Sequence, residues 1–236
     1  MKTVFMDIDG CILDQSGECN ASIEELVRKI KEEEEKGFIF GLNSNRGEED
    51  LKIIQKMLDL EGPLIVENGA AILFREKYEY AQHLKAPENY IPIVISNLKK
   101  TSEYKSGIFY DSRRAYTFSI YCINKGKPDL KTAVNVKKEL EKIYPRHKVW
   151  IKPNKGHIWC IDPNVNKGTA ISEFIKIYNA RVAMIGHDHA DIPALAKAHM
   201  SAVPANCSGG ISAHYKSRLS YTKGVIDCIT HICKQL

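Results

Sequence analysis

The sequence predicts an α/β fold, a Rossmann-like parallel sheet with an inserted α+β domain, and three observations lead to it. Short apolar runs alternate with amphipathic segments in the first and last thirds of the chain, as in parallel sheets covered by helices. The middle third breaks this alternation, because tyrosines and charges become denser there. Polar residues follow several apolar runs, where open α/β sheets bind ligands. We therefore expect a core of residues 1–76 and 161–236 and an insertion at 77–160.

The first third has the pattern strand, helix, strand, helix, strand. Ser22, with Glu25 three residues later, resembles a capping box, and apolar residues then recur at helical spacing up to Gly37. Strands are predicted at 3–6, 38–42 and 63–66, and a second helix at 51–60.

The middle and last thirds follow different patterns. The middle third predicts helices at 87–100 and 131–144 and strands at 116–123, 148–152 and 157–161. This suggests a small antiparallel sheet of its own, although the segment could instead extend the first sheet. The last third predicts helices at 168–178, 192–197 and 225–233 and strands at 181–185 and 201–203.

Composition excludes several classes of protein. With 236 residues, 44% hydrophobic and 27% charged, the chain is neither disordered nor fibrous. A formal charge of +5 slightly favours small anionic ligands, and no basic run is interleaved with aromatics as in nucleic-acid binding. No apolar run approaches the roughly 18 residues of a spanning helix, so we expect a cytoplasmic protein without a membrane partner. The seven cysteines form no CxxC pair, and we expect most of them to be small buried hydrophobes.

Two acids follow the first predicted strand. Asp7 and Asp9 flank Ile8 and precede Gly10. A two-residue step along an extended chain points both carboxylates to the same side. Such a pair can hold a divalent cation, supply a nucleophile, or divide into an acid and a base. Alternatively, the residues only shape a turn.

Two further polar positions adjoin predicted helices. Ser44 and Asn45 lie in the segment 43–46, after the second strand, where a hydroxyl and backbone N–H groups can bind a phosphoryl oxygen or simply cap the helix. Lys167 begins a helix, where the helix dipole disfavours a cation. A nearby anion would remove this penalty; otherwise Lys167 is a solvated lysine.

The segment 186–191 is the densest cluster of potential metal ligands in the sequence. It contains His187, Asp188, His189 and Asp191 after the strand at 181–185. The alternative is a polar loop in which an aspartate caps the next helix.

Taken in order, these residues resemble the motifs of the haloacid dehalogenase (HAD) superfamily of phosphatases. The matching positions are the stretch from Asp7 to Gly10, Ser44, Lys167 and an acidic motif ending in Asp191. The stretches 66–70, 165–168 and 203–206 resemble the branch with an α/β cap, which includes archaeal phosphoglycolate phosphatase, mannosyl-phosphoglycerate phosphatase and sucrose-phosphate phosphatase. The length is most similar to the phosphoglycolate phosphatase type.

The resemblance implies a metal-dependent phosphatase, a hydrolase of carbohydrate metabolism acting on a small phosphorylated metabolite such as a sugar phosphate or a phosphoglycolate-like acid. Asp7 would form an aspartyl-phosphate and Asp9 would act as acid and then base. Ser44, Asn45 and Lys167 would bind the phosphate. Mg²⁺ would bind Asp7, the backbone carbonyl of Asp9 and an acid of the last motif.

The last motif departs from the family pattern. His187 stands where the family has aspartate, and Ala190 where it has asparagine. Asp188 or Asp191 would then supply the carboxylate ligand, or His187 would ligate directly and favour Mn²⁺, Co²⁺ or Zn²⁺.

This departure keeps two other functions open. One is a catalytically degenerate relative that binds a phosphorylated ligand or a partner without turnover, and the other is a phosphomutase. In the cap, the basic segments 113–114 and 152–157 are candidates to meet a substrate carboxylate. We expect a monomer or a homodimer.

Overall fold

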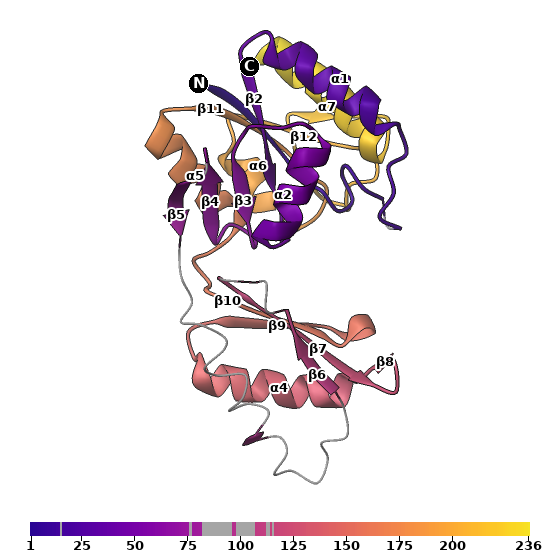
Figure 1. The fold of residues 1–236 in the computed structure, drawn as a ribbon, viewed down its shortest axis with the longest axis vertical. Helices are drawn as coiled ribbons and strands as arrows, with labels where there is room; N and C mark the ends of the chain where they lie inside the picture. The colour runs from indigo at the N-terminus through magenta and orange to yellow at the C-terminus, as the bar shows by residue number, and fades with distance from the viewer. Residues whose placement is uncertain (15, 76, 82–95, 98–106, 112–113, 115) are drawn as a thin grey trace. The chain divides into compact units, whose positions relative to one another are not determined.

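The computed structural model describes residues 1–14, 16–75, 77–81, 96–97, 107–111, 114 and 116–236. The chain forms two compact units, one of Met1–Ala81 with Asn166–Leu236 and one of Gln82–Val165. The first has a largely parallel sheet and the second a separate antiparallel sheet, which confirms the predicted fold class (Figure 1). Residues 77–81, which the sequence assigned to the insertion, pair with the core sheet as its last strand.

The core sheet has eight strands in the order β13-β12-β11-β1-β2-β3-β4-β5. Neighbours from β13 to β3 are parallel, and β3, β4 and β5 are antiparallel to one another. The strands are β1 (Lys2–Met6), β2 (Phe38–Asn43), β3 (Leu64–Val66), β4 (Ala71–Phe74), β5 (Lys77–Ala81), β11 (Arg181–Ile185), β12 (Met200–Val203) and β13 (Tyr215–Lys216).

The core helices are α1 (Ile23–Glu34), α2 (Glu48–Met57), α5 (Lys167–Tyr178), α6 (Ile192–Lys197) and α7 (Tyr221–Gln235). The Ser22 hydroxyl accepts a hydrogen bond from the Glu25 N–H, which confirms the Ser22 half of the predicted capping box of α1. Helix α7 begins four residues before the predicted start at 225. A Cβ on Gly224 would lie 2.3 Å from the Leu219 carbonyl oxygen, so this glycine allows a close backbone approach inside the helix.

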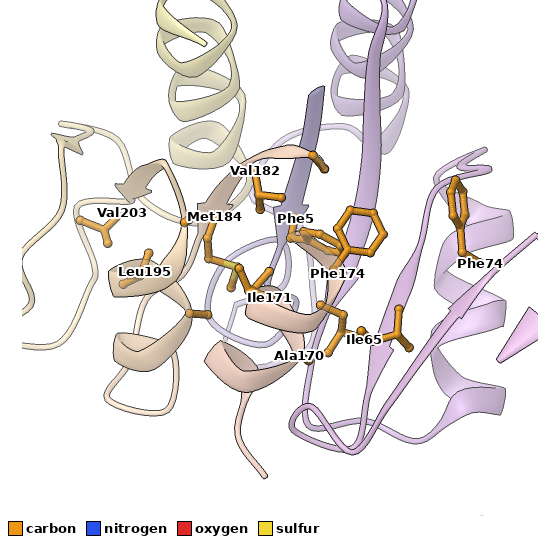
Figure 2. Packing of buried hydrophobic residues seen from close by; sticks show 14 residues of the cluster. Phe5, Ile65, Phe74, Ala170, Ile171, Phe174, Val182, Met184, Leu195 and Val203 are labelled. Carbon is orange, nitrogen blue, oxygen red and sulfur yellow. The ribbon is translucent and has the colours of Figure 1, made fainter. Parts of the chain in front are cut away.

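A buried apolar cluster joins α5 to the sheet (Figure 2). Phe174 of α5 meets Phe5 of β1 edge to face, with ring centroids 5.1 Å apart. Ala170 and Ile171, one turn earlier on α5, are fully buried in the same cluster. This packing fixes the start of α5 at one edge of the sheet.

The register of the central strands brings three strand ends together. Met6, the last residue of β1, pairs with Leu42 of β2 on one side and with Ile185 of β11 on the other. The segments that follow these strands therefore lie at the same edge of the sheet. They begin at Asp7, Ser44 and Gly186.

The second unit has an antiparallel sheet in the order β6-β7-β10-β9, with β8 paired to β7. Its elements are β6 (Gly107–Tyr110), β7 (Phe118–Asn124), β8 (Lys127–Pro128), α4 (Leu130–Ile143), β9 (Lys148–Lys152), the 3-10 turn Pro153–Lys155 and β10 (His157–Ile161). Helix α4 packs on the sheet through Val136 and Leu140. The predicted helix at 87–100 lies outside the described residues, except that 96–97 are helical. Arg113 also lies outside them.

The sequence patterns missed five short strands: β4, β5, β6, β8 and β13. The two shortest, β8 and β13, have two residues each, too few for a period to emerge. No helix in the described part of the chain is both long and apolar enough to cross a membrane.

Candidate active site

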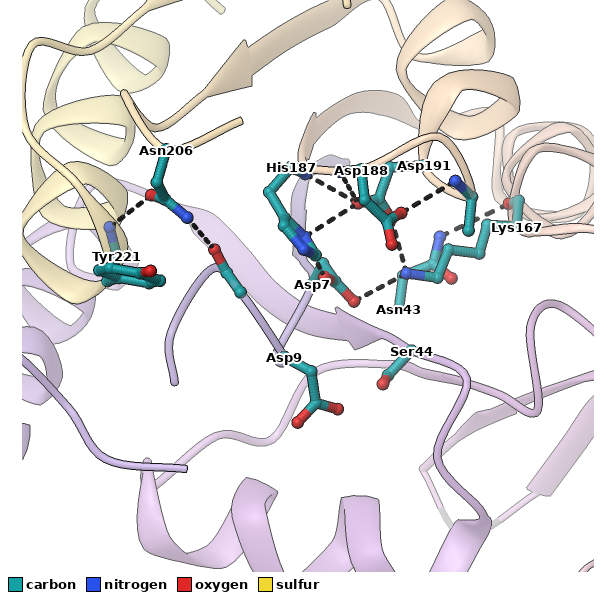
Figure 3. Close-up of polar contacts among 12 residues, drawn as sticks. Asp7, Asp9, Asn43, Ser44, Lys167, His187, Asp188, Asp191, Asn206 and Tyr221 are labelled. Carbon is teal, nitrogen blue, oxygen red and sulfur yellow. Dashed lines mark hydrogen bonds and ion pairs between the residues drawn. The ribbon is translucent and has the colours of Figure 1, made fainter. Parts of the chain in front are cut away.

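Four charged or titratable side chains meet at the edge of the sheet where β1 and β11 end. The Lys167 ammonium lies 2.7 Å from Asp7 Oδ1 and 2.6 Å from Asp191 Oδ1 (Figure 3). His187 Nδ1 lies 3.0 Å from Asp7 Oδ2 and 3.5 Å from Asp191 Oδ2. An ammonium and an imidazole therefore bridge two carboxylates that come from opposite ends of the chain.

Helix α5 presents Lys167 to this cluster from its first turn. The Asn166 side chain caps the helix by accepting from the N–H groups of Gly168 and Thr169. Lys167 is 3% exposed, so it is not a solvated lysine. The two carboxylates offset both its burial and the unfavourable helix dipole.

Burial and mutual charge shift the pKa values of the cluster. Burial and the neighbouring Asp191 raise the pKa of Asp7 above its ordinary value, although Lys167 and His187 oppose them. Burial also opposes ionisation of Asp191, but Lys167 and His187 outweigh it and hold the pKa of Asp191 well below its usual range. Burial acts to lower the pKa of His187, yet Asp191 and Asp7 raise it to about 10. Without a bound cation, the imidazole is therefore protonated at neutral pH.

Asp191 also organises the loop between β11 and α6. Its Oδ2 accepts hydrogen bonds from the backbone N–H groups of His187, at 2.7 Å, and Asp188, at 3.1 Å. Asp188 turns to its own loop instead, where its Oδ1 accepts from the Ala190 N–H. Of the two acids considered as ligands in this motif, Asp191 is the one that pairs with Lys167 and His187.

Asp9 has different partners from Asp7. Its carboxylate forms a two-point ion pair with Arg46, at 2.8 Å to Nε and 2.6 Å to Nη2. Burial acts to raise the pKa of Asp9, but Arg46 outweighs it and lowers the pKa. Strand β1 ends at Met6, so Asp7 to Asp9 form a turn rather than an extended segment. The rule that places alternate side chains on one side therefore does not apply.

Ser44 links this pair to the end of β2. Its side chain is buried, and its hydroxyl accepts a 3.3 Å hydrogen bond from the Arg46 N–H. The Ser44 N–H donates to the Ile65 carbonyl, which holds the loop against β3. Asn45 is half-buried in the same loop.

Three residues of the site had no predicted role. The Asn206 amide donates to the Gly10 carbonyl, and its Oδ1 accepts from the Tyr221 N–H, so it ties the loop after β1 to the start of α7. Arg46 and Cys11 are the other two. Asn206 and Arg46 stand within segments that the sequence had marked, but only the fold reveals their partners.

The donor atoms of the cluster fit a divalent cation. Asp7, Cys11 and His187 each offer one ligand atom, and these atoms all lie within 4.8 Å of one another. His187, Asp188 and Asp191 form a second such group. In the metal-free site, Lys167 and the protonated His187 balance the two carboxylates, so a dication that binds here takes the place of the imidazole proton.

Comparison with known proteins agrees with this architecture. The model of the haloacid dehalogenase-like hydrolase family matches residues 4–147. A glucosyl-3-phosphoglycerate/mannosyl-3-phosphoglycerate phosphatase of Persephonella marina is 31% identical over 75 residues, which are 32% of this chain and 27% of that protein. The match thus spans less than a third of that relative.

Two solved structures share the fold over nearly the whole chain. A haloacid dehalogenase-like hydrolase from Bacteroides thetaiotaomicron matches with a TM-score of 0.78 at 17% identity, and the match covers 98% of this chain and 99% of that one. A HAD subclass IIB sugar phosphatase has a TM-score of 0.67 at 14% identity, covering 98% and 99%.

The fold and the site define a domain with a largely parallel α/β core sheet, an inserted second sheet and a buried carboxylate–lysine cluster at the carboxyl edge of the core sheet. Since the family model matches more than half of the chain, the protein belongs to the haloacid dehalogenase-like hydrolases.

Proposed function

We propose that the protein is a metal-dependent phosphatase that hydrolyses a small phosphorylated metabolite, a sugar phosphate or a phosphoglycolate-like acid, through an aspartyl-phosphate. The observation that supports this most is the buried Lys167 bridging Asp7 and Asp191. Family membership and the similarity to a glycosyl-phosphoglycerate phosphatase support the same reaction class.

Asp7 is the proposed nucleophile. Its carboxylate attacks phosphorus, and the bond between phosphorus and the leaving oxygen breaks. Lys167, held 2.7 Å from Asp7, together with Ser44 and Asn45, binds the phosphoryl oxygens and stabilises the charge that spreads over them.

Asp9 is the proposed acid and base. It donates a proton to the leaving oxygen, and it later takes a proton from the water that attacks the aspartyl-phosphate and releases phosphate. Because Arg46 lowers the pKa of Asp9, the carboxyl group must separate from Arg46 before it carries a proton.

Asp7, Asp191 and His187 are the proposed holders of the cation, with the Asp9 carbonyl in addition; in this family it is Mg²⁺. When bound, the cation supplies positive charge that lets a carboxylate approach a phosphate. The backbone N–H groups of His187 and Asp188 hold the Asp191 carboxylate in place.

The test is phosphate release by the full chain from p-nitrophenyl phosphate, phosphoglycolate, sugar phosphates and glycosyl-phosphoglycerates, each with Mg²⁺, Mn²⁺ or Co²⁺. We expect release with at least one metal and one natural class of phosphoester. Absence of release under every condition would contradict the proposal and favour a phosphate-binding protein without turnover. Transfer of phosphate to an acceptor instead of water would favour a phosphomutase.

A further inference from the structure

The cluster around Asp7 contains nitrogen and sulfur donors beside its carboxylates. Cys11 lies four residues after Asp7, at the far side of the turn that follows β1. The thiol, the His187 imidazole and the Asp7 carboxylate each place a ligand atom within 4.8 Å of the other two. Cys11 is fully buried, and its thiol makes no hydrogen bond in the described part of the chain.

The position of the imidazole is shaped by its neighbours. Gly10 has a φ of +91°, and a Cβ there would lie 2.1 Å from His187 Nε2. The imidazole ring therefore occupies the space that the side chain of any residue other than glycine would need at position 10. On its other side, Nδ1 faces Oδ2 of both Asp7 and Asp191 (Figure 3). The ring therefore presents a nitrogen where two carboxylate oxygens converge.

This donor set does not suit Mg²⁺ alone. Mg²⁺ prefers oxygen ligands and keeps several waters, whereas imidazole and thiolate favour Zn²⁺ and Co²⁺. A thiol buried without a hydrogen-bond partner beside an imidazole and a carboxylate is arranged as a ligand for such an ion.

We propose that Asp7, Cys11 and His187, with Asp191 adjoining, bind a borderline transition dication, Zn²⁺ or Co²⁺, in preference to Mg²⁺. On binding, the Cys11 S–H bond and one N–H bond of the His187 imidazolium break. The sulfur and that nitrogen each donate an electron pair to the metal, and both protons leave to solvent. The inference rests on the proposed function only for the role of the ion, because the donors are defined by geometry.

The test is a titration of the metal-free full chain with Co²⁺, followed by absorption spectroscopy. We expect one Co²⁺ per chain, d–d bands in the visible and a thiolate-to-cobalt charge-transfer band in the near ultraviolet, all persisting in a large excess of Mg²⁺. A spectrum without the charge-transfer band, with Co²⁺ displaced by Mg²⁺ at comparable concentration, would overturn the inference.

Variants separate the donors. Cys11→Ser should remove the charge-transfer band and keep the d–d bands, whereas Cys233→Ser, in α7, should change neither. His187→Asp should weaken Co²⁺ binding by about 10-fold or more and strengthen Mg²⁺ binding. The matched control is His189→Asp, an exposed histidine of the same loop, which should leave both affinities unchanged.

The spectrum of the unmodified protein decides the question even if a variant fails to fold. Phosphate release supported by Mg²⁺ without a cobalt charge-transfer band would overturn this inference and leave the proposed phosphatase standing. The band without phosphate release under any metal would support the metal site and contradict the proposed phosphatase.

Discussion

Two carboxylates that stand two residues apart are paired with cations in different surroundings. Asp7 and Lys167 have side chains that are 5% and 4% exposed, whereas Asp9 and Arg46 are 56% and 33% exposed. A buried pair has lost its water, so removing one partner leaves an uncompensated charge. In an exposed pair, either side chain can exchange its partner for water at little cost in free energy.

This difference suits the two proposed roles. A nucleophile must keep one position relative to the phosphoryl group, and the buried cluster holds Asp7 from two sides. A proton donor must gain and lose a proton, and Asp9 can leave Arg46 without disturbing the core. The following predictions test whether burial separates the two pairs in this way.

The largest effect should follow Asp7→Asn. The amide cannot attack phosphorus, so we expect turnover to fall by about four orders of magnitude or more. The fold should be retained, because the volume is unchanged and Lys167 keeps Asp191 as a partner. Steady-state phosphate release and circular dichroism measure the two properties. Asp59→Asn, at a 76% exposed side chain, is the control. Comparable activity in the two variants would contradict the assignment of the nucleophile.

Lys167→Met should lower the free energy of unfolding by about 3–5 kcal/mol, because two buried carboxylates lose their shared ammonium. Urea denaturation measures the change. Lys176→Met, on the same helix with a 77% exposed side chain, should stay within about 0.5 kcal/mol of the unmodified protein. Equal losses in both variants would mean that the cluster adds no stability beyond that of a surface charge.

The metal-free protein should lose stability as the pH rises. The pKa of His187 is raised from 6.5 to about 10 in the folded state. Its contribution to stability is therefore fully present below pH 6.5 and is lost as the pH rises through 10. Urea midpoints across this range measure it, and His187→Gln should flatten the dependence. An unchanged slope in that variant would show that another group titrates.

The sequence predicts the strands that form the site better than the contacts within it. Runs such as β1, β2 and β11 are apolar because both faces of a parallel sheet are buried, and polar residues mark their ends. Since parallel strands end at one edge, grouping Asp7 with residues of the last motif follows from the pattern alone.

The partners could not be predicted, because they depend on turns. The chain leaves the extended conformation after Met6, which separates Asp9 from Asp7 and pairs it with Arg46. The same turn carries Cys11 to His187, two residues far apart in the chain. Spacing rules for metal ligands detect only donors that are close in sequence, so they could not identify Cys11 and His187 as neighbours.

The smallest change in stability should follow Arg46→Met. The ion pair with Asp9 is largely exposed, so we expect a loss within about 1 kcal/mol, similar to that of Arg28→Met, which breaks the exposed pair with Glu32. Without Arg46, the pKa of Asp9 rises toward its ordinary value.

A higher pKa keeps Asp9 protonated to higher pH. If Asp9 is the acid, the descending limb of kcat/KM for a substrate with a poor leaving group should therefore move to higher pH in Arg46→Met and stay in place in Arg28→Met. A limb that does not move would contradict the acid role of Asp9. A loss of several kcal/mol in the free energy of unfolding of Arg46→Met would contradict the view that burial holds only the pair of Asp7 and Lys167.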